Sequence, residues 1–106
     1  MNNMPYQAQQ MEIICESPEV RVAEITLSPL SDTPPHRHSM AEEICYCLDG
    51  ELTCEIVSNA TILKAGERMR FAAGQDHGLR NRTVARCRFL LIHGGGKFDF
   101  VASNER

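Results

Sequence analysis

Apolar and polar residues alternate with a period of two through most of this chain, as in β-strands that bury one face. The alternation predicts a first strand over 19–27 and a β-hairpin over 43–57. Asp49-Gly50, flanked by β-forming residues, is the expected two-residue turn of that hairpin. Further short strands are expected over 60–63, 69–71, 77–83 and 86–93. No segment has the 3.6-residue period of an amphipathic helix.

Turn-forming residues separate the predicted strands at short intervals. Prolines break the chain between 29 and 35, and glycine-containing turns are expected at 64–67 and 72–76. Many short strands with frequent turns favour a closed or sandwich-like antiparallel fold, and closure removes the exposed edges of a sheet. We therefore expect one all-β domain over 11–106, preceded by a polar arm or edge segment over 1–10.

The composition is that of one globular domain with nearly balanced charge. The chain has 106 residues with 11 basic and 14 acidic side chains, a net charge of −3. A nucleic-acid partner favours a basic stripe, which the scattered basic residues do not form. No apolar run approaches the ~20 residues of a membrane helix, and the N-terminus lacks the basic start and apolar stretch of a signal peptide. We expect a cytoplasmic protein without nucleic-acid or membrane partners.

The chain has an odd number of cysteines and no Cys-x-x-Cys pair. The cysteines are Cys15, Cys45, Cys47, Cys54 and Cys87. In a reducing compartment we expect five free thiols, since buried cysteine packs as a small hydrophobic residue. The predicted hairpin places Cys45 opposite Cys54. A pocket lined by thiols is the alternative interpretation.

Three histidines and one glutamate have a spacing that suits a metal site. His36 and His38 are two residues apart, so on a strand both side chains point to the same face. Glu43 follows five residues later, and His77 lies on a later predicted strand. Three imidazoles and one carboxylate suit iron, manganese, nickel, copper or zinc, and they leave open coordination positions. From the residues alone, structural histidines with satisfied hydrogen bonds remain an alternative.

Two segments of the chain resemble the two sequence motifs of the cupin family. The first is His36-x-His38, four residues, Glu43, six residues, Gly50. The second is Gly66, five residues, Ala72-x-Gly74, two residues, His77, three residues, Asn81. The resemblance implies an antiparallel, jelly-roll-like cupin β-barrel. It also implies one divalent transition metal ion with four protein ligands: His36, His38, Glu43 and His77.

Two turn positions depart from these motifs. The cupin pattern prefers glycine six positions before the first histidine, where this chain has Leu30, and proline where it has Ala72. The departures concern loop shape and leave all four ligand positions filled by the expected residue types. The segment 89–100 is similar to the last strand and exit of small cupins like quercetin dioxygenase.

Strand alternation places further residues around the predicted metal centre. The expected pocket residues are Cys45, Cys47, Met69, Phe71 and Phe89. His93 shares the parity of Phe89 and is a candidate proton acceptor there, although a lone histidine at a strand end is more often structural or exposed. Asn81 is expected to be a strand-end hydrogen bonder rather than a ligand.

The resemblance implies a metal-dependent enzyme: a dioxygenase, isomerase or lyase that acts on a small carbonyl or hydroxyl compound. In this hypothesis the substrate binds the metal through an oxygen, and Glu43 accepts a substrate proton. The alternatives are a non-catalytic binding or sensor module for small molecules and a purely structural metal, although structural sites are usually closed. Small cupins resemble one another in pairing, and an outward row of Ile44, Tyr46 and Leu48 exposes apolar surface, so we expect a homodimer.

Overall fold

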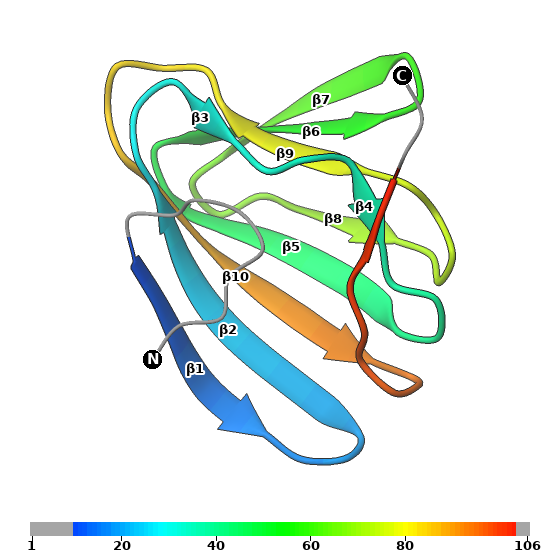
Figure 1. The fold of residues 1–106 in the computed structure, drawn as a ribbon. Helices are drawn as coiled ribbons and strands as arrows, with labels where there is room; N and C mark the ends of the chain where they lie inside the picture. The colour runs from blue at the N-terminus through cyan, green and yellow to red at the C-terminus, as the bar shows by residue number, and fades with distance from the viewer. Residues whose placement is uncertain (1–9, 104–106) are drawn as a thin grey trace.

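The computed structural model describes residues 10–103, which form eleven strands and no helix (Figure 1). The strands are β1 (Gln10–Glu16), β2 (Val20–Leu27), β3 (Ser31–Asp32), β4 (His36–Arg37), β5 (Glu42–Asp49), β6 (Glu51–Ile56), β7 (Asn59–Lys64), β8 (Arg68–Phe71), β9 (Gly78–Asn81), β10 (Cys87–Gly94) and β11 (Val101–Ala102). No helix long and apolar enough to span a membrane occurs within this range.

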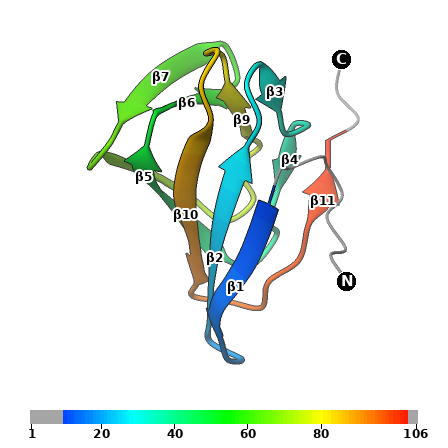
Figure 2. The ribbon, with the colours of Figure 1, turned by 90° about the vertical axis from the view of Figure 1, so that its left-hand side faces the viewer.

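Two facing sheets and one short strand pair make up the molecule, and all their pairings are antiparallel. The larger sheet has the order β1-β2-β10-β5-β8, and the smaller sheet has the order β3-β9-β6-β7. Figures 1 and 2 show the smaller sheet above the larger one, with β11 beside β4. From β5 to β10 the chain passes repeatedly from one sheet to the other. The predicted all-β, jelly-roll-like barrel is confirmed.

Inward-facing side chains fill the space between the sheets. On β5, Glu43, Cys45 and Cys47 are buried, whereas the residues between them are only half-buried, as the alternation predicted. The core cluster consists of Ile25, Leu27, Cys45, Cys47, Leu52, Cys54, Leu63, Phe71, Leu79, Cys87, Phe89 and Leu91. All five cysteines are free thiols, as expected, and only Cys15 is exposed.

The predicted hairpin over 43–57 is wrong. β5 and β6 lie in different sheets, and Gly50 marks the corner where the chain crosses between them. Gly50 has φ +82°, and a Cβ there would lie 2.6 Å from the Arg86 carbonyl oxygen, so only glycine fits. Asp49-Gly50 therefore forms a corner between the two sheets. The same dipeptide suits a hairpin turn, because both the corner and a hairpin turn need a residue with positive φ. Cys45 and Cys54 are consequently not cross-strand neighbours, although their thiols meet between the two sheets.

The N-terminal edge of the larger sheet is a strand that the alternation did not reveal. β1 begins at Gln10, inside the segment expected to be an arm or edge, and pairs with β2. The remainder of that segment, 1–9, lies outside the described residues. Most of β1 is exposed, so it lacks the alternating burial on which the prediction relied.

Two residues other than glycine adopt the left-handed conformation. Leu30, at the position where the cupin motif prefers glycine, has φ 56°, and Val57, in the turn between β6 and β7, has φ 53°. For a β-branched residue such as Val57 this conformation is strained. Val57 is 96% exposed, so no burial of its side chain offsets the strain.

Replacement of Val57 by glycine is expected to stabilise the protein. The left-handed conformation costs an L-residue roughly 1–2 kcal/mol, of which the entropy of the added glycine cancels about 0.5–1 kcal/mol. A net gain of about 0.5–1 kcal/mol should raise the midpoint of thermal unfolding. Val84→Gly is the matched control and should lower the midpoint, because Val84 is also exposed but has an ordinary φ. A lower midpoint for Val57→Gly contradicts the strain.

Candidate metal centre

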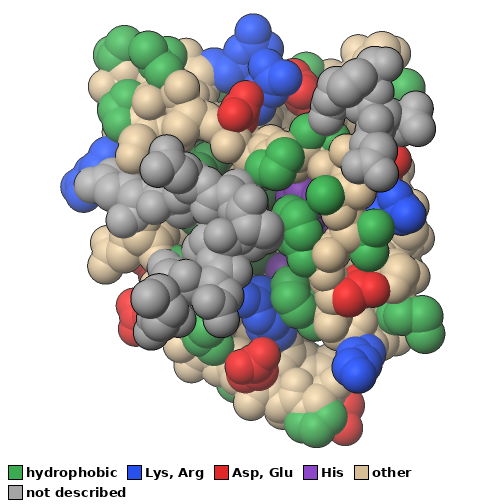
Figure 3. Space-filling view, viewed as in Figure 1, with side chains coloured by type: hydrophobic (Ala, Val, Ile, Leu, Met, Phe, Trp, Pro, Cys, Tyr) green, Lys and Arg blue, Asp and Glu red, His purple; other side chains and the backbone are tan. Residues whose placement is uncertain are grey.

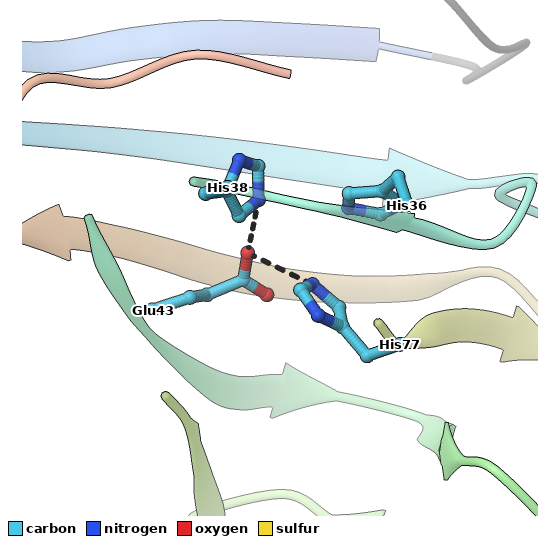
Figure 4. A group of neighbouring side chains, drawn as sticks. All are labelled: His36, His38, Glu43 and His77. Carbon is cyan, nitrogen blue, oxygen red and sulfur yellow. Dashed lines mark hydrogen bonds and ion pairs between the residues drawn. The ribbon is translucent and has the colours of Figure 1, made fainter. Parts of the chain in front are cut away.

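The four predicted metal ligands come together from three parts of the chain. His36 begins β4 and His38 follows that strand, Glu43 lies on β5, and His77 directly precedes β9. All four are buried, with at most 3% of each residue exposed. Their candidate ligand atoms lie within 4.8 Å of one another. Figure 4 shows the side chains of His38 and His77 directed at the Glu43 carboxylate.

Backbone hydrogen bonds fix the two segments that carry His36 and His77. The His36 N–H donates to the His77 carbonyl at 2.9 Å, and the His77 N–H donates to the His36 carbonyl at 2.8 Å. This antiparallel pair places the two imidazoles together, with ring centroids 4.5 Å apart. The ladder between β4 and the start of β9 therefore sets the spacing of two ligands.

A backbone carbonyl holds the Nδ1 atom of each ligand histidine. Pro34 O lies 2.9 Å from His36 Nδ1, Gln75 O lies 2.9 Å from His77 Nδ1, and Asp99 O contacts His38 Nδ1. A carbonyl oxygen only accepts, so each Nδ1 carries the proton and donates it. In the neutral imidazole the Nε2 lone pair is then available to a metal, which is the usual arrangement behind metal-binding histidines.

Buried acceptors face one another at the centre of this group. The Nε2 atoms of His38 and His77 lie 2.9 and 3.3 Å from Glu43 Oε1 (Figure 4). Lone pairs opposed at these distances repel one another unless a cation, a proton or a metal ion, lies between them. Within residues 10–103, Glu43 Oε2 and His77 Nε2 have no hydrogen-bond partner. Unsatisfied buried groups cost about 1–3 kcal/mol each, so a divalent metal ion fits this donor set.

The protonation states of Glu43 and His36 suit metal ligands. Burial disfavours ionised Glu43, yet the surrounding imidazoles of His38, His77 and His93 hold the pKa of its carboxyl well below the ordinary value. Burial lowers the pKa of His36 to about 4. Burial also acts to lower the pKa of His38, but hydrogen bonds to Glu43 and Asp99 raise it above the ordinary value. The centre thus offers an ionised carboxylate and a neutral His36 at neutral pH.

His93 belongs to this group as well. It lies on β10 in register with Glu43 on β5 and with Arg21 on β2. Its Nε2 is 2.9 Å from Glu43 Oε1, and the residue is 2% exposed. The prediction that His93 lies by the metal ligands therefore agrees with its placement, whereas its proton-accepting role stays a prediction.

A C-terminal segment that the sequence analysis did not assign to the site lies over the histidines. The ring of Phe100 stacks on His36 at 4.4 Å, and the ring of Phe98 is 5.1 Å from His38. Between them, the Asp99 carboxylate accepts hydrogen bonds from the Ser39 backbone and hydroxyl. Figure 3 shows hydrophobic side chains on this face, with little histidine surface visible between them. The Phe-x-Phe spacing was the only sequence signal for this cover.

The other predicted pocket residues lie in the core. Cys45, Cys47, Phe71 and Phe89 are fully buried, and Met69 packs against the core cluster. Of these, Phe71 touches a ligand, because its ring stacks on His77 at 4.1 Å. None of the five residues lines the surface hollow beside Pro34 and Asp76 or the one beside Leu30 and Arg82.

Two further features concern the predicted site. A hollow of about 500 Å³ reaches the centre only at His77, on the side of Pro34 and Asp76. Asn81 is a hydrogen bonder, as expected: its amide donates to the carbonyls of Leu27, Ser28 and Ala85. Asn81 is therefore occupied by backbone groups rather than directed at a metal ion.

An antiparallel barrel that encloses three histidines and one glutamate defines a jelly-roll protein with a candidate metal centre. Residues 23–93 match the cupin domain family. This match covers most of the chain, and the protein therefore belongs to the cupin family. None of the curated proteins matches the chain.

Solved structures share the fold. An uncharacterized conserved protein with a double-stranded β-helix domain from Klebsiella pneumoniae has a TM-score of 0.82 and 20% identity, over 99% of this chain and 90% of that chain. The polyketide cyclase RemF from Streptomyces resistomycificus has a TM-score of 0.76 and 21% identity, over 93% of this chain and 75% of that chain. For an oxalate oxidase the values are 0.72 and 23%, over 79% of this chain and 46% of that one, about half its length. Identities this low show the fold alone.

Acidification from pH 6.5 to 4 is expected to destabilise the metal-free protein. An unfolded histidine binds a proton near pH 6.5, whereas folded His36 does so only near 4. One such histidine lowers the free energy of unfolding by about 1.4 kcal/mol for each pH unit across this window. Burial lowers the pKa of His93 too, so it adds to the loss. The raised pKa of His38 keeps it protonated in both states there, so it contributes nothing.

Urea unfolding with a chelator present, repeated across this pH range, measures the slope of the free energy of unfolding against pH. His36→Asn is expected to reduce the slope by about one proton, whatever its effect on stability at pH 7. An unchanged slope in the variant contradicts the assignment of this pH dependence to His36.

Proposed function

We propose that the protein is a metal-dependent cupin enzyme that acts on a small carbonyl or hydroxyl compound, as a dioxygenase, isomerase or lyase. The observation that carries the proposal is the convergence of carbonyl-bound imidazoles on one buried carboxylate, with two acceptor atoms that lack partners among the described residues. Iron, manganese, nickel, copper or zinc suits these donors. The naming of RemF as a cyclase and of oxalate oxidase as an oxidase supports an enzymatic use of this fold.

The ligands and the metal have separate tasks in this proposal. When bound, the metal supplies Lewis acidity or activates oxygen. The histidines hold it through Nε2, because their Nδ1 atoms are engaged by backbone carbonyls. Glu43 is the ligand best able to change role, since a carboxylate has two oxygens and several lone pairs. We infer that Glu43 accepts a substrate proton. Because its lowered pKa makes it a weak base, we expect a contribution at the low end of the usual range, roughly a hundredfold in rate.

The aromatic cover indicates what kind of substrate fits. Phe98 and Phe100 lie directly against the ligand histidines, so a molecule that reaches the metal from this side contacts their rings. Aromatic faces favour flat or apolar groups over anionic ones, and the Arg21 guanidinium lies over the Phe98 ring at 4.2 Å. A small, flat compound with a carbonyl or hydroxyl oxygen for the metal satisfies both features.

A non-catalytic binding or sensor module is the second candidate. The cover supports it, because rings packed on the histidines limit the approach of a second reactant. Such a module is expected to bind a small molecule at the metal without turning it over. Turnover of the bound compound separates the two candidates.

Metal content and oxygen uptake of anaerobically purified protein test the proposed enzyme. We expect about one transition metal ion per chain, sharply less in His77→Ala, and oxygen uptake with a catechol, flavonol or diketone. Glu43→Gln should reduce turnover roughly a hundredfold, because the amide cannot accept the proton. Glu42→Gln is the matched control, since Glu42 is the exposed neighbour on the same strand. Full turnover in Glu43→Gln contradicts the general-base role. If the wild type binds the small molecule without turning it over, the sensor module is favoured.

We also propose that the protein is a homodimer. On the outer face of the larger sheet, Ile92 lies in register with Val22 on one side and Ile44 on the other, and all three are only half-buried. Light scattering should give twice the 11.9 kDa chain mass. Ile92→Lys should yield the monomer, whereas Ile62→Lys, at an exposed isoleucine of the other sheet, should leave the dimer intact. A monomeric wild type at micromolar concentration refutes the dimer.

A further inference from the structure

His93 makes a single directed contact at the candidate metal centre. Its Nε2 lies 2.9 Å from Glu43 Oε1, and the side chains of both residues are 1% exposed. The two residues are paired across β10 and β5, so the sheet itself brings them together. Because an ionised carboxylate only accepts hydrogen bonds, His93 Nε2 carries a hydrogen and donates it to Glu43.

The tautomer of His93 is the reverse of that of the ligand histidines. His36, His38 and His77 donate Nδ1–H to the backbone, which turns their Nε2 atoms toward the centre. His93 donates through Nε2, and its Nδ1 has no hydrogen-bond partner in the described part of the chain. The Nε2–H of His93 thus has no lone pair to offer a metal, and His93 lies outside the group of mutually close ligand atoms.

The two oxygens of Glu43 differ in the same way. Oε1 receives the hydrogen bond from His93 and also faces the Nε2 atoms of His38 and His77, while Oε2 is buried and has no hydrogen-bond partner within 10–103. The groups packed on His93 leave it no other anchor. His38 lies against it with ring centroids 4.5 Å apart, and Phe98 lies at 4.7 Å. Arg21 faces it across the strand pair.

We propose that His93 is a positioning residue that holds the Glu43 carboxylate through an Nε2–H donated to Oε1 and so fixes the orientation of this ligand toward the metal. The inference rests on the proposed metal centre and adds a fifth residue, which acts on the metal only through Glu43. Hydrogen-bond donors behind metal ligands typically contribute 10- to 100-fold to metal affinity. Loss of the Nε2–H is therefore expected to weaken metal binding by that factor.

Three variants separate the donated hydrogen from the bulk of the ring. Glutamine places an amide N–H where Nε2–H lies, asparagine reaches only as far as Nδ1, and leucine removes both donors. Co²⁺ is the probe, with affinity measured by competition against a chromophoric chelator and geometry by visible absorption. We expect His93→Gln to bind within about threefold of wild type with the same spectrum. His93→Asn and His93→Leu should bind 10- to 100-fold more weakly with altered absorption bands.

Each other outcome overturns the role of His93. Unchanged affinity and spectrum in His93→Leu show that Glu43 needs no anchor. Equal weakening in all three variants shows that the ring acts by packing. If His93→Leu fails to fold, as judged by thermal unfolding without metal, the contrast between glutamine and asparagine decides. A wild type that does not bind Co²⁺ overturns the metal centre itself, a failure distinct from any difference among variants.

Discussion

The buried carboxylate of Glu43 determines the arrangement of the residues around it. An ionised group with 1% exposure costs several kcal/mol of desolvation unless hydrogen bonds and opposite charge compensate it. The compensation comes from elements far apart in the sequence: His38 after β4, His77 before β9 and His93 on β10. The larger sheet, the smaller sheet and the segment between them therefore all meet at one side chain. The fold and the candidate site depend on the same interaction.

Backbone carbonyls convert this cluster of histidines into a set of ligands. Each ligand histidine is oriented by a backbone carbonyl. Pro34 and Gln75 lie two residues before their histidines, His36 and His77, and Asp99 contacts His38. Asp99 is the exception in sequence, since it follows β10, and Ser39 hydrogen-bonds its carboxylate. The segment that covers the centre thus also sets the tautomer of one ligand, so movement of the cover and the strength of the site are coupled.

The sequence predicted the parts of this protein that local rules determine. Strand alternation placed Glu43 inward, and the spacing of His36 and His38 placed both on one face. The prediction from sequence failed where one local signal is compatible with two structures. At Gly50 the positive φ belongs to a corner between sheets rather than to a hairpin. The prediction also failed where position depends on distant contacts. The stacking of Phe100 on His36 results from the pairing of β11 with β4, which no local pattern encodes.

The packing between the sheets bears on access to the candidate metal centre. Cys45 and Cys87 are fully buried, and burial raises the pKa of both thiols, that of Cys87 to about 12. Neutral thiols are poor nucleophiles, so they serve as filling rather than as reactants. A substrate path among the buried thiols requires repacking of a closed core, which costs roughly 1–3 kcal/mol of stability for each side chain that no longer fits. The segment 95–100 has no regular secondary structure, and such segments open at lower cost than sheets. Displacement of Phe98 and Phe100 therefore costs less than a path between the sheets, and a hollow already reaches the centre at His77.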